Sequence, residues 1–489
     1  MQYSHLFRHH GIAITLATTL AAALGGCAAM PPATRLAQPL AAAQVAAPAS
    51  FAGDAAFPAD GWWQAYGDPG LDALIAEGLA HSPDMAIAAA RVRGADGIAR
   101  QAGSANLPAI GVDGMAGGNK QSYNLGIPEQ FVPHGVVDTG RLSATLGLDI
   151  DLWGRSRAAL AAARGEAEAA RVDAAQARLT LASGIALAWG DLAQLVAARA
   201  IAAQQARAAG DTERLALARG RAGIDSAAEA EIAKARHAGA QQALAALDEA
   251  IALGRNRIAA LIGAGPGRAA TLPLPALDLS APTALPADLQ ANLVGRRPDL
   301  VSARLRTEAA AQRVRVAKLD FYPNINLGAV AGLQALGLSQ VFDSGSTYAS
   351  FGPAISLPIF QGGRLRGRYD GAAAAYQEAA ARYDQTLLGA LREVADTLDS
   401  RRALTARLDS ARAADSAATE AARLIQLRYA QGIASQLQVL AAQDTALGTH
   451  RLVIELETRA YLLDVMLVKA LGGGFRETAR RAETPMGNS

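Results

Sequence analysis

The sequence predicts a mixed α/β membrane protein assembled from two internal repeats, each with two membrane β-strands and one long helical hairpin. Three observations lead to this fold class: a duplication of more than two hundred residues, short segments of strictly alternating polarity, and two very long proline-free segments rich in alanine. Helices of such length fall far outside the range of ordinary globular proteins.

The duplication is visible in short matching motifs. Ser82-Pro83-Asp84 returns as Arg297-Pro298-Asp299, a separation of 298 − 83 = 215. Further along the chain, residues 219–226 align with residues 428–435, a separation of 428 − 219 = 209. A unit of this size is too long for a solenoid repeat and indicates a duplicated domain. The separation falls by six, so one loop is shorter in the second copy.

The strands are predicted from alternation. Between Arg141 and Leu152 every second residue is apolar, with polar residues or glycine between them. That length matches the 9–11 residues of a tilted membrane strand with an apolar outer face. A partner strand is expected at about 107–117, and the second copy places its strands at about 322–332 and 348–357. An ordinary half-buried sheet remains an alternative for these four segments taken alone.

The helical hairpins follow the strand pairs. No proline occurs from Arg155 to Arg219 or from Arg364 to Tyr429, and about 65 helical residues span about 100 Å. Each segment ends at a glycine-containing break and continues into a return helix that closes at Gly263 or Gly472. The predicted hairpins cover 155–262 and 364–471, with coiled-coil-like packing or a helical tube as the expected arrangement.

A sharp strand-to-helix junction is expected where each second strand ends. Proline ends sheet pairing, and glycine permits the turn into the helix that follows. The predicted junction residues are Trp153, Gly154, Pro358, Phe360, Gly362 and Gly363.

The N-terminus has the pattern of a lipoprotein signal peptide. Arg8-His9-His10 precede an apolar run from Ile12 to Leu24, too short to span a bilayer. The run ends in Leu24-Gly25-Gly26-Cys27, which resembles a bacterial lipobox, and Cys27 is the only cysteine. We therefore expect a signal peptide at 1–26, diacylglycerol and an N-acyl chain on Cys27, and a lipidated spacer at 27–57. No later segment is expected to cross a membrane as a helix.

Composition argues against several functions. The formal net charge is +2 and no basic patch occurs, which disfavours a nucleic-acid partner. Seven scattered histidines and one cysteine offer no metal spacing. Motifs of hydrolases, kinases and dinucleotide-binding enzymes do not occur, so no catalytic residue and no enzyme activity are expected. Charged helix residues such as Glu166 and Glu393 are expected in solvated faces or inter-helix pairs.

Four strands per chain cannot close a barrel, and a membrane sheet does not leave open edges in lipid. Closure therefore requires several subunits. Two chains would give eight strands and a lumen filled by side chains, whereas three would give twelve strands and an open lumen.

The motifs together resemble the outer-membrane efflux protein (TolC-type) family, and the lipobox with Trp62-Trp63 resembles its NodT-type lipoproteins. The resemblance rests on Arg296-Arg297-Pro298-Asp299-Leu300, Phe321-Tyr322-Pro323, the segment 357–364, Arg392-Glu393-Val394 and the segment 428–432. It implies a homotrimer with a twelve-stranded outer-membrane β-barrel continued by a long periplasmic α-helical barrel. The implied repeats are 58–264 and 287–475, joined by a linker at 265–286 and followed by a tail at 476–489.

The resemblance also implies a function: the outer-membrane channel subunit of a tripartite efflux system. Such a channel passes drugs or other small molecules from an inner-membrane efflux pump and a periplasmic adaptor protein to the exterior. A passive lipoprotein pore and the outer-membrane component of type I protein secretion are the alternatives.

The turns between the long helices and their return helices would form the periplasmic tip, where relatives dock the adaptor. The chain departs from the family at Gln438, where an acidic residue is common, and its repeat partner is Glu229. If an acidic ring narrows the tip, Asp225 or Glu229 would supply it. The predicted tip residues are Arg219, Gly223, Asp225, Ser226, Glu229, Arg428, Tyr429, Gly432, Ser435 and Gln438.

Overall fold

The computed structural model describes residues 38–40, 57–124, 126–224, 226–277 and 295–477. The chain divides into two compact units. The first, here called the sheet unit, includes Arg93–Ala169 and Arg304–Arg382, and the second, the hairpin unit, includes Leu40–Val92, Ala170–Ala303 and Tyr383–Ser489. The long helices α4 (Arg155–Arg221) and α9 (Arg364–Ala430) contribute residues to both units, which are described separately below.

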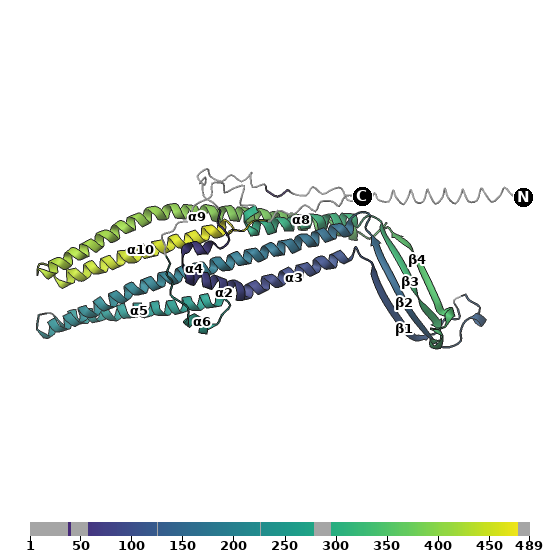
Figure 1. Cartoon of the computed structure of the whole chain (residues 1–489), viewed down its shortest axis with the longest axis horizontal. Helices are drawn as coiled ribbons and strands as arrows, with labels where there is room; N and C mark the ends of the chain where they lie inside the picture. The colour runs from purple at the N-terminus through teal and green to yellow at the C-terminus, as the bar shows by residue number, and fades with distance from the viewer. Residues whose placement is uncertain (1–37, 41–56, 125, 225, 278–294, 478–489) are drawn as a thin grey trace. The chain divides into compact units, whose positions relative to one another are not determined.

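Four antiparallel strands form one sheet in the order β1-β2-β3-β4 (Figure 1). The strands are β1 (Ala109–Asn119), β2 (Val137–Ile150), β3 (Asn324–Leu336) and β4 (Thr347–Ser356). The strand β2 begins four residues before the predicted start, because Val137 and Asp138 pair with Asn119 and Gly118. Gly140 interrupts the apolar alternation there, which is why the pattern in the sequence begins later. The connection at 120–136 is longer than the one at 337–346, as the change in repeat separation indicates.

The cross-strand register gives this sheet one apolar face and one polar face. Ile110, Leu146, Ala329 and Phe351 lie in one row across the four strands, and the next rows on that face are also apolar. Adjacent strand positions point to the opposite face, which carries Asp113, Arg141, Ser143, Thr145, Asp149, Asn326, Gln334, Tyr348 and Ser350. The large apolar residues Ile110, Val112, Phe351 and Ile355 are all more than two-thirds exposed. This is the two-sided pattern of a lipid-facing strand set.

Helical segments complete the sheet unit: parts of α3 (Pro83–Ser104), α4 and α9, and most of α8 (Pro298–Leu319). Gly165 of α4 packs against α8, where an added Cβ would lie 3.2 Å from the Cβ of Ala309. Glu166 forms an ion pair with Arg313 of α8 at 2.9 Å, and the Thr307 hydroxyl donates to the carbonyl oxygen of Ala379 in α9 at 3.2 Å. Glu166 is therefore in an inter-helix pair, one of its two expected roles.

Two hairpins dominate the hairpin unit. The first joins α4 (Arg155–Arg221) to α5 (Ala227–Leu261), and the second joins α9 (Arg364–Ala430) to α10 (Gln436–Ala470). Gly254 of α5 lies against Leu192 of α4. In the second hairpin Leu404, Leu456 and Leu463 belong to one apolar cluster. Each 67-residue helix spans about 100 Å at 1.5 Å per residue.

The largest apolar core of the hairpin unit forms around Trp189. Its indole Nε1 donates a 2.8 Å hydrogen bond to Asp68, whose carboxylate also caps α2 (Pro69–His81) through the backbone nitrogens of Gly70 and Leu71. Tyr461 of α10 donates to the carbonyl oxygen of Ala186 at 3.1 Å. Burial raises the pKa of Tyr461, so its hydroxyl stays protonated and available as a donor.

One long helix has the length and apolar composition of a membrane span. Among the described residues, α4 contains an 18-residue window apolar enough to cross a membrane by length and composition, and half of that window is buried. Ile185, Trp189 and Leu192 of α4 are fully buried in the core of the hairpin unit. Packing in the core of the hairpin unit therefore accounts for the apolar character of these residues.

Candidate functional site: sheet, junctions and tips

The first strand-to-helix junction is held by Trp153, Gly154 and their neighbours in the sheet unit. Gly154 has φ = 84°, a left-handed conformation that favours glycine. The indole Nε1 of Trp153 donates a 2.8 Å hydrogen bond to the carbonyl oxygen of Pro323, and its ring lies 5.3 Å from that of Tyr322. These contacts hold the end of β2 against the start of β3, and β3 belongs to the second repeat.

The second junction lies between β4 and α9. Gly362 and Gly363 have φ values of 55° and 84°, and the backbone nitrogen of Gly367 donates to the carbonyl oxygen of Gly363 at 2.9 Å. Pro358 precedes this turn, and the ring of Phe360 is 88% exposed. Trp153 is also 45% exposed. Aromatic side chains at the end of a membrane sheet suit the interface between lipid and water.

Asp320, which sequence reasoning did not single out, connects the starts of the two long helices. It accepts a hydrogen bond from Arg155 of α4 at 2.7 Å and another from Arg368 of α9 at 3.1 Å. Its side chain is only 11% exposed. The two repeats are therefore joined just beyond the sheet by one carboxylate.

The first tip turn follows α4. Gly223 has φ = 72°, and the backbone nitrogen of Ile224 donates to the carbonyl oxygen of Arg219 at 2.9 Å. Ser226 caps α5, because its hydroxyl accepts a hydrogen bond from the backbone nitrogen of Glu229 in the first turn of that helix. Glu229 is exposed. Asp225 lies outside the described residues.

The second tip turn has the same geometry. Gly432 has φ = 75°, and the backbone nitrogen of Ile433 donates to the carbonyl oxygen of Arg428 at 2.8 Å. Ser435 and Gln438 form a reciprocal capping box: the Gln438 side chain accepts from the Ser435 nitrogen at 2.9 Å. Gln438 therefore has a local structural role, which a neutral amide fills as well as a carboxylate does.

Both turns expose apolar side chains. Ile224, Ile433 and Leu437 are 64%, 62% and 64% exposed, and Tyr429 is 38% exposed. Large apolar groups at the ends of polar helices are typical of surfaces that bind another protein.

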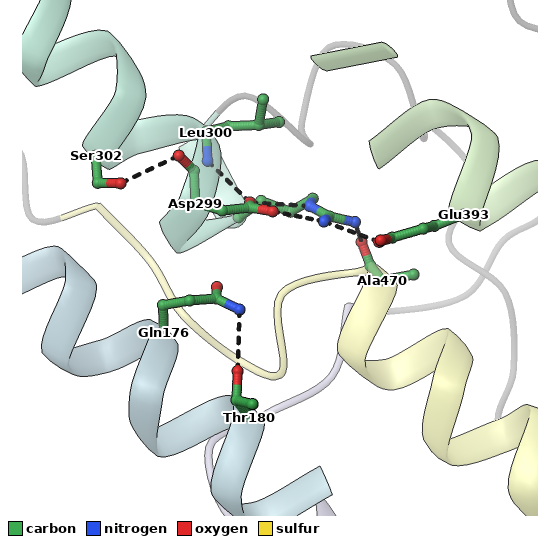
Figure 2. A network of polar contacts seen from close by, with 8 residues as sticks. Gln176, Thr180, Asp299, Leu300, Ser302, Glu393 and Ala470 are labelled. Atoms are coloured by element: carbon green, nitrogen blue, oxygen red, sulfur yellow. Dashed lines mark hydrogen bonds and ion pairs between the residues drawn. The ribbon is translucent and has the colours of Figure 1, made fainter. Parts of the chain in front are cut away.

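A buried ionic network organises the hairpin unit at the start of α8. Arg297 donates to both carboxylate oxygens of Asp299, at 3.1 and 2.6 Å, and to Glu393 of α9 at 3.0 Å. It also donates to the carbonyl oxygen of Ala470, at the C-terminal end of α10, at 2.9 Å. Figure 2 shows Asp299, Leu300, Glu393 and Ala470 converging on this network. Glu393 is therefore in an inter-helix pair.

The charge of Arg297 is stabilised although its side chain is only 8% exposed. Burial by itself lowers the pKa of the guanidinium, but the hydrogen bonds and negative charges of Asp299 and Glu393 raise it overall. The carbonyl end of α10 adds a favourable helix dipole. The motif Arg297-Pro298-Asp299 contributed to the family resemblance, but nothing local in the sequence identified its partners in α9 and α10.

Cys27, the predicted lipid-attachment residue, lies outside the described residues. So do the signal peptide, most of the spacer, and parts of the linker and of the tail. Among the described residues, no cluster of three or more histidine or acidic side chains could hold a metal ion.

Comparison with known proteins identifies the family. The profile of the outer membrane efflux protein family matches residues 74–264 and 289–473. The fusaric acid resistance protein FusA of Burkholderia cepacia is 37% identical over 330 residues, 64% of this chain and 59% of FusA. The multidrug resistance outer membrane protein MdtP of Escherichia coli K12 is 30% identical over 85% of this chain and 86% of MdtP.

Solved structures agree with this assignment. The outer membrane protein VceC of Vibrio cholerae has a TM-score of 0.79 and 39% identity, covering 86% of this chain and all of VceC. The two matched segments of the family profile correspond to the two repeats seen in the sequence, each with two strands and one hairpin. The chain belongs to the outer membrane efflux protein family and is an outer-membrane efflux channel protein.

Proposed function

We propose that three copies of this chain close a twelve-stranded barrel in the outer membrane and form a conduit for small molecules. The observation that carries this proposal is the sheet, which has a continuous apolar face and a polar face across all four strands. In the barrel the apolar face meets lipid and the polar face lines the lumen.

The edges of the sheet support assembly. Among the residues that the structure describes, β1 pairs only with β2 and β4 pairs only with β3. An edge left open in lipid exposes unsatisfied backbone groups, so β1 of one copy pairs with β4 of the next. Three copies give twelve strands and a lumen wider than that of an eight-stranded barrel, which side chains fill.

The tips are the contact point for a periplasmic adaptor protein. Exposed Ile224, Ile433 and Leu437 provide the apolar surface, while Ser226 and Ser435 fix the adjoining helix starts. An inner-membrane efflux pump supplies the energy, because the channel performs no chemistry. The predicted tip residues Arg219, Glu229, Arg428 and Tyr429 belong to the same surface.

The cargo is a drug or another small organic molecule. The names of FusA and MdtP associate those two relatives with fusaric acid resistance and multidrug resistance. Diacylglycerol and an N-acyl chain on Cys27 add a lipid anchor to the barrel. A passive pore and a type I secretion channel are the rival functions, and neither accounts better for the exposed tip residues.

The test combines assembly with adaptor capture. Native gels of the membrane-extracted chain should show a heat-sensitive trimer, and planar bilayers should show channels. A photo- or thiol-reactive crosslinker on Ser435→Cys should capture the adaptor of the same system. Ser410 is exposed on α9, 430 − 410 = 20 residues before the end of that helix, so Ser410→Cys is the matched control and should capture far less. Equal capture at both positions, or a monomer without channels, would contradict the proposal.

A further inference from the structure

One strand residue stands apart by its charge. In the four strands, which the structure describes throughout, Arg141 is the only basic residue, whereas Asp113, Asp138 and Asp149 are acidic. The register places Arg141, Asp113 and Asp149 on the polar face. That face therefore combines an excess of negative charge with a single cation.

Arg141 lies over the ring of Tyr348, with 5.8 Å between the guanidinium carbon and the ring centroid. The two residues belong to β2 and β4, so their side chains meet across β3. Opposite Tyr348 on β3 stands Gly332. A Cβ at this position would lie 2.2 Å from the carbonyl oxygen of Leu142 and 2.8 Å from the Cα of Ser143. The glycine allows β2 to approach closely and puts no side chain between the guanidinium and the ring.

The contact with Tyr348 leaves the N–H donors of the guanidinium available. An aromatic ring attracts a cation through its π-system, and a guanidinium carries five N–H donors for other partners. Arg141 is exposed, and among the described residues no carboxylate lies within ion-pair distance of it. Asp149, near the opposite end of β2, accepts from the side-chain nitrogen of Asn326 at 2.9 Å.

We propose that Arg141, positioned by Tyr348, is the anion-attracting residue of the pore and sets how readily anionic solutes pass the outer part of the barrel. The proposal rests on the proposed function, because the polar face becomes a lumen only when copies of the chain close a barrel. Arg141 lies four residues from the loop end of β2, about 13 Å along the strand. Three copies would place a ring of three guanidinium groups there.

The experiment measures ion selectivity of the purified full-length trimer in planar lipid bilayers. The reversal potential under a KCl gradient gives the permeability ratio of K⁺ to Cl⁻. A unit positive charge about 7 Å from an ion in water repels K⁺ and attracts Cl⁻ by about the thermal energy each. Because both permeabilities change in opposite directions, Arg141→Gln should raise the ratio by about sevenfold, and Arg141→Glu should raise it further.

Four further variants separate the effect of position from the effect of net charge. Arg141→Lys keeps the charge and should stay near the wild-type ratio. Asp113→Asn, on the same face, should lower the ratio. Tyr348→Leu keeps every charge but removes the platform, so it should move the ratio toward that of Arg141→Gln, whereas Tyr348→Phe should not.

An unchanged ratio in both Arg141→Gln and Arg141→Glu, with normal trimers on native gels, would overturn the proposal while leaving the channel function intact. Equal shifts in Arg141→Lys and Arg141→Gln would also overturn it, because charge would then not be the cause. Wild-type protein that forms no channel at all would instead contradict the proposed function. If Arg141→Gln fails to assemble, Arg141→Lys and Tyr348→Leu still test the proposal. An unchanged permeability ratio in Tyr348→Leu, or a large shift in Arg141→Lys, would overturn it.

Discussion

Arg297 and Ala470 are joined by a hydrogen bond of 2.9 Å from the guanidinium Nη1 to the backbone carbonyl oxygen, across 173 positions of sequence. The same guanidinium reaches Asp299 and Glu393. One side chain thus connects the start of α8, the middle of α9 and the end of α10 within the hairpin unit.

We expect Arg297→Ala to destabilise the hairpin unit strongly, because it removes the cation that pairs with Asp299 and Glu393 and the donor to the carbonyl oxygen of Ala470. Breaking a buried pair costs about 3–5 kcal/mol, and the half-exposed Glu393 places this case at the low end, about 3 kcal/mol. Thermal unfolding followed by circular dichroism measures the loss. Arg392→Ala, which removes an exposed pair with Asp396, is the control and should cost at most about 0.5 kcal/mol. Similar losses in the two variants would contradict the assigned role of Arg297.

The ion pair between Glu77 and Arg268 predicts that the stability of the fold depends on pH in the acid range. The hydrogen bond from Arg268 of α6 (Pro266–Ala270) lowers the pKa of Glu77 below its ordinary 4.5. A carboxylate with a lowered pKa in the folded state stabilises the protein fully above about pH 4.5, and that contribution disappears as the pH falls through the folded pKa. The melting temperatures of the wild type and Glu77→Gln should therefore differ at pH 7 and converge near pH 3.

The matched control is Glu378→Gln, which removes an exposed carboxylate paired with Arg382 in α9. It should change the melting temperature little at either pH. A difference in melting temperature between the wild type and Glu77→Gln that grows toward low pH would have the opposite sign and would contradict the role of Arg268.

Replacing either of two glycines in the second hairpin by alanine should change its stability, in opposite directions at the two positions. Gly432 has φ = 75°, so Gly432→Ala strains the tip turn by about 1–2 kcal/mol. Gly448 lies inside α10, and an added Cβ there would have no atom within 4 Å. Gly448→Ala should therefore stabilise the helix by up to about 1 kcal/mol, because alanine has the higher helix propensity. Hydrogen exchange of backbone amides in the tip and in α10 measures the local stability in each variant. Stability changes of the same sign in both variants would argue against the left-handed turn.

Neighbouring residues of β3 offer a test of the two faces. Ala329 shares its row with Leu146 and Phe351, whereas Val330 shares its row with Thr145 and Ser350. A lysine facing lipid near the middle of a membrane strand costs about 2–4 kcal/mol. Ala329→Lys should therefore reduce the heat-sensitive trimer in outer-membrane fractions, while Val330→Lys should assemble and alter conductance. Reversed outcomes would assign the faces the other way round.

Local patterns in the sequence were sufficient for the elements and the family. Alternation predicted strands, because side chains of a strand point to opposite faces, and proline-free segments predicted the long helices, because proline breaks helices. Gly154, Gly363 and Gly432 were predicted at turns, and all three adopt positive φ values there. The early start of β2 was missed, because its first residues are strand only through pairing with β1.

Partners far apart in sequence were decided only by tertiary structure. The contacts of Arg297 with Glu393 and Ala470, of Asp320 with two helix starts, and of Asp68 with Trp189 join separate elements. Arg141 meets Tyr348 only because Gly332 lies between them in the register. Periodicity reports which face of an element a residue occupies, so the sequence alone determined the repeat, the strands and the hairpins. Which faces meet, and at which residues, depends on packing in three dimensions.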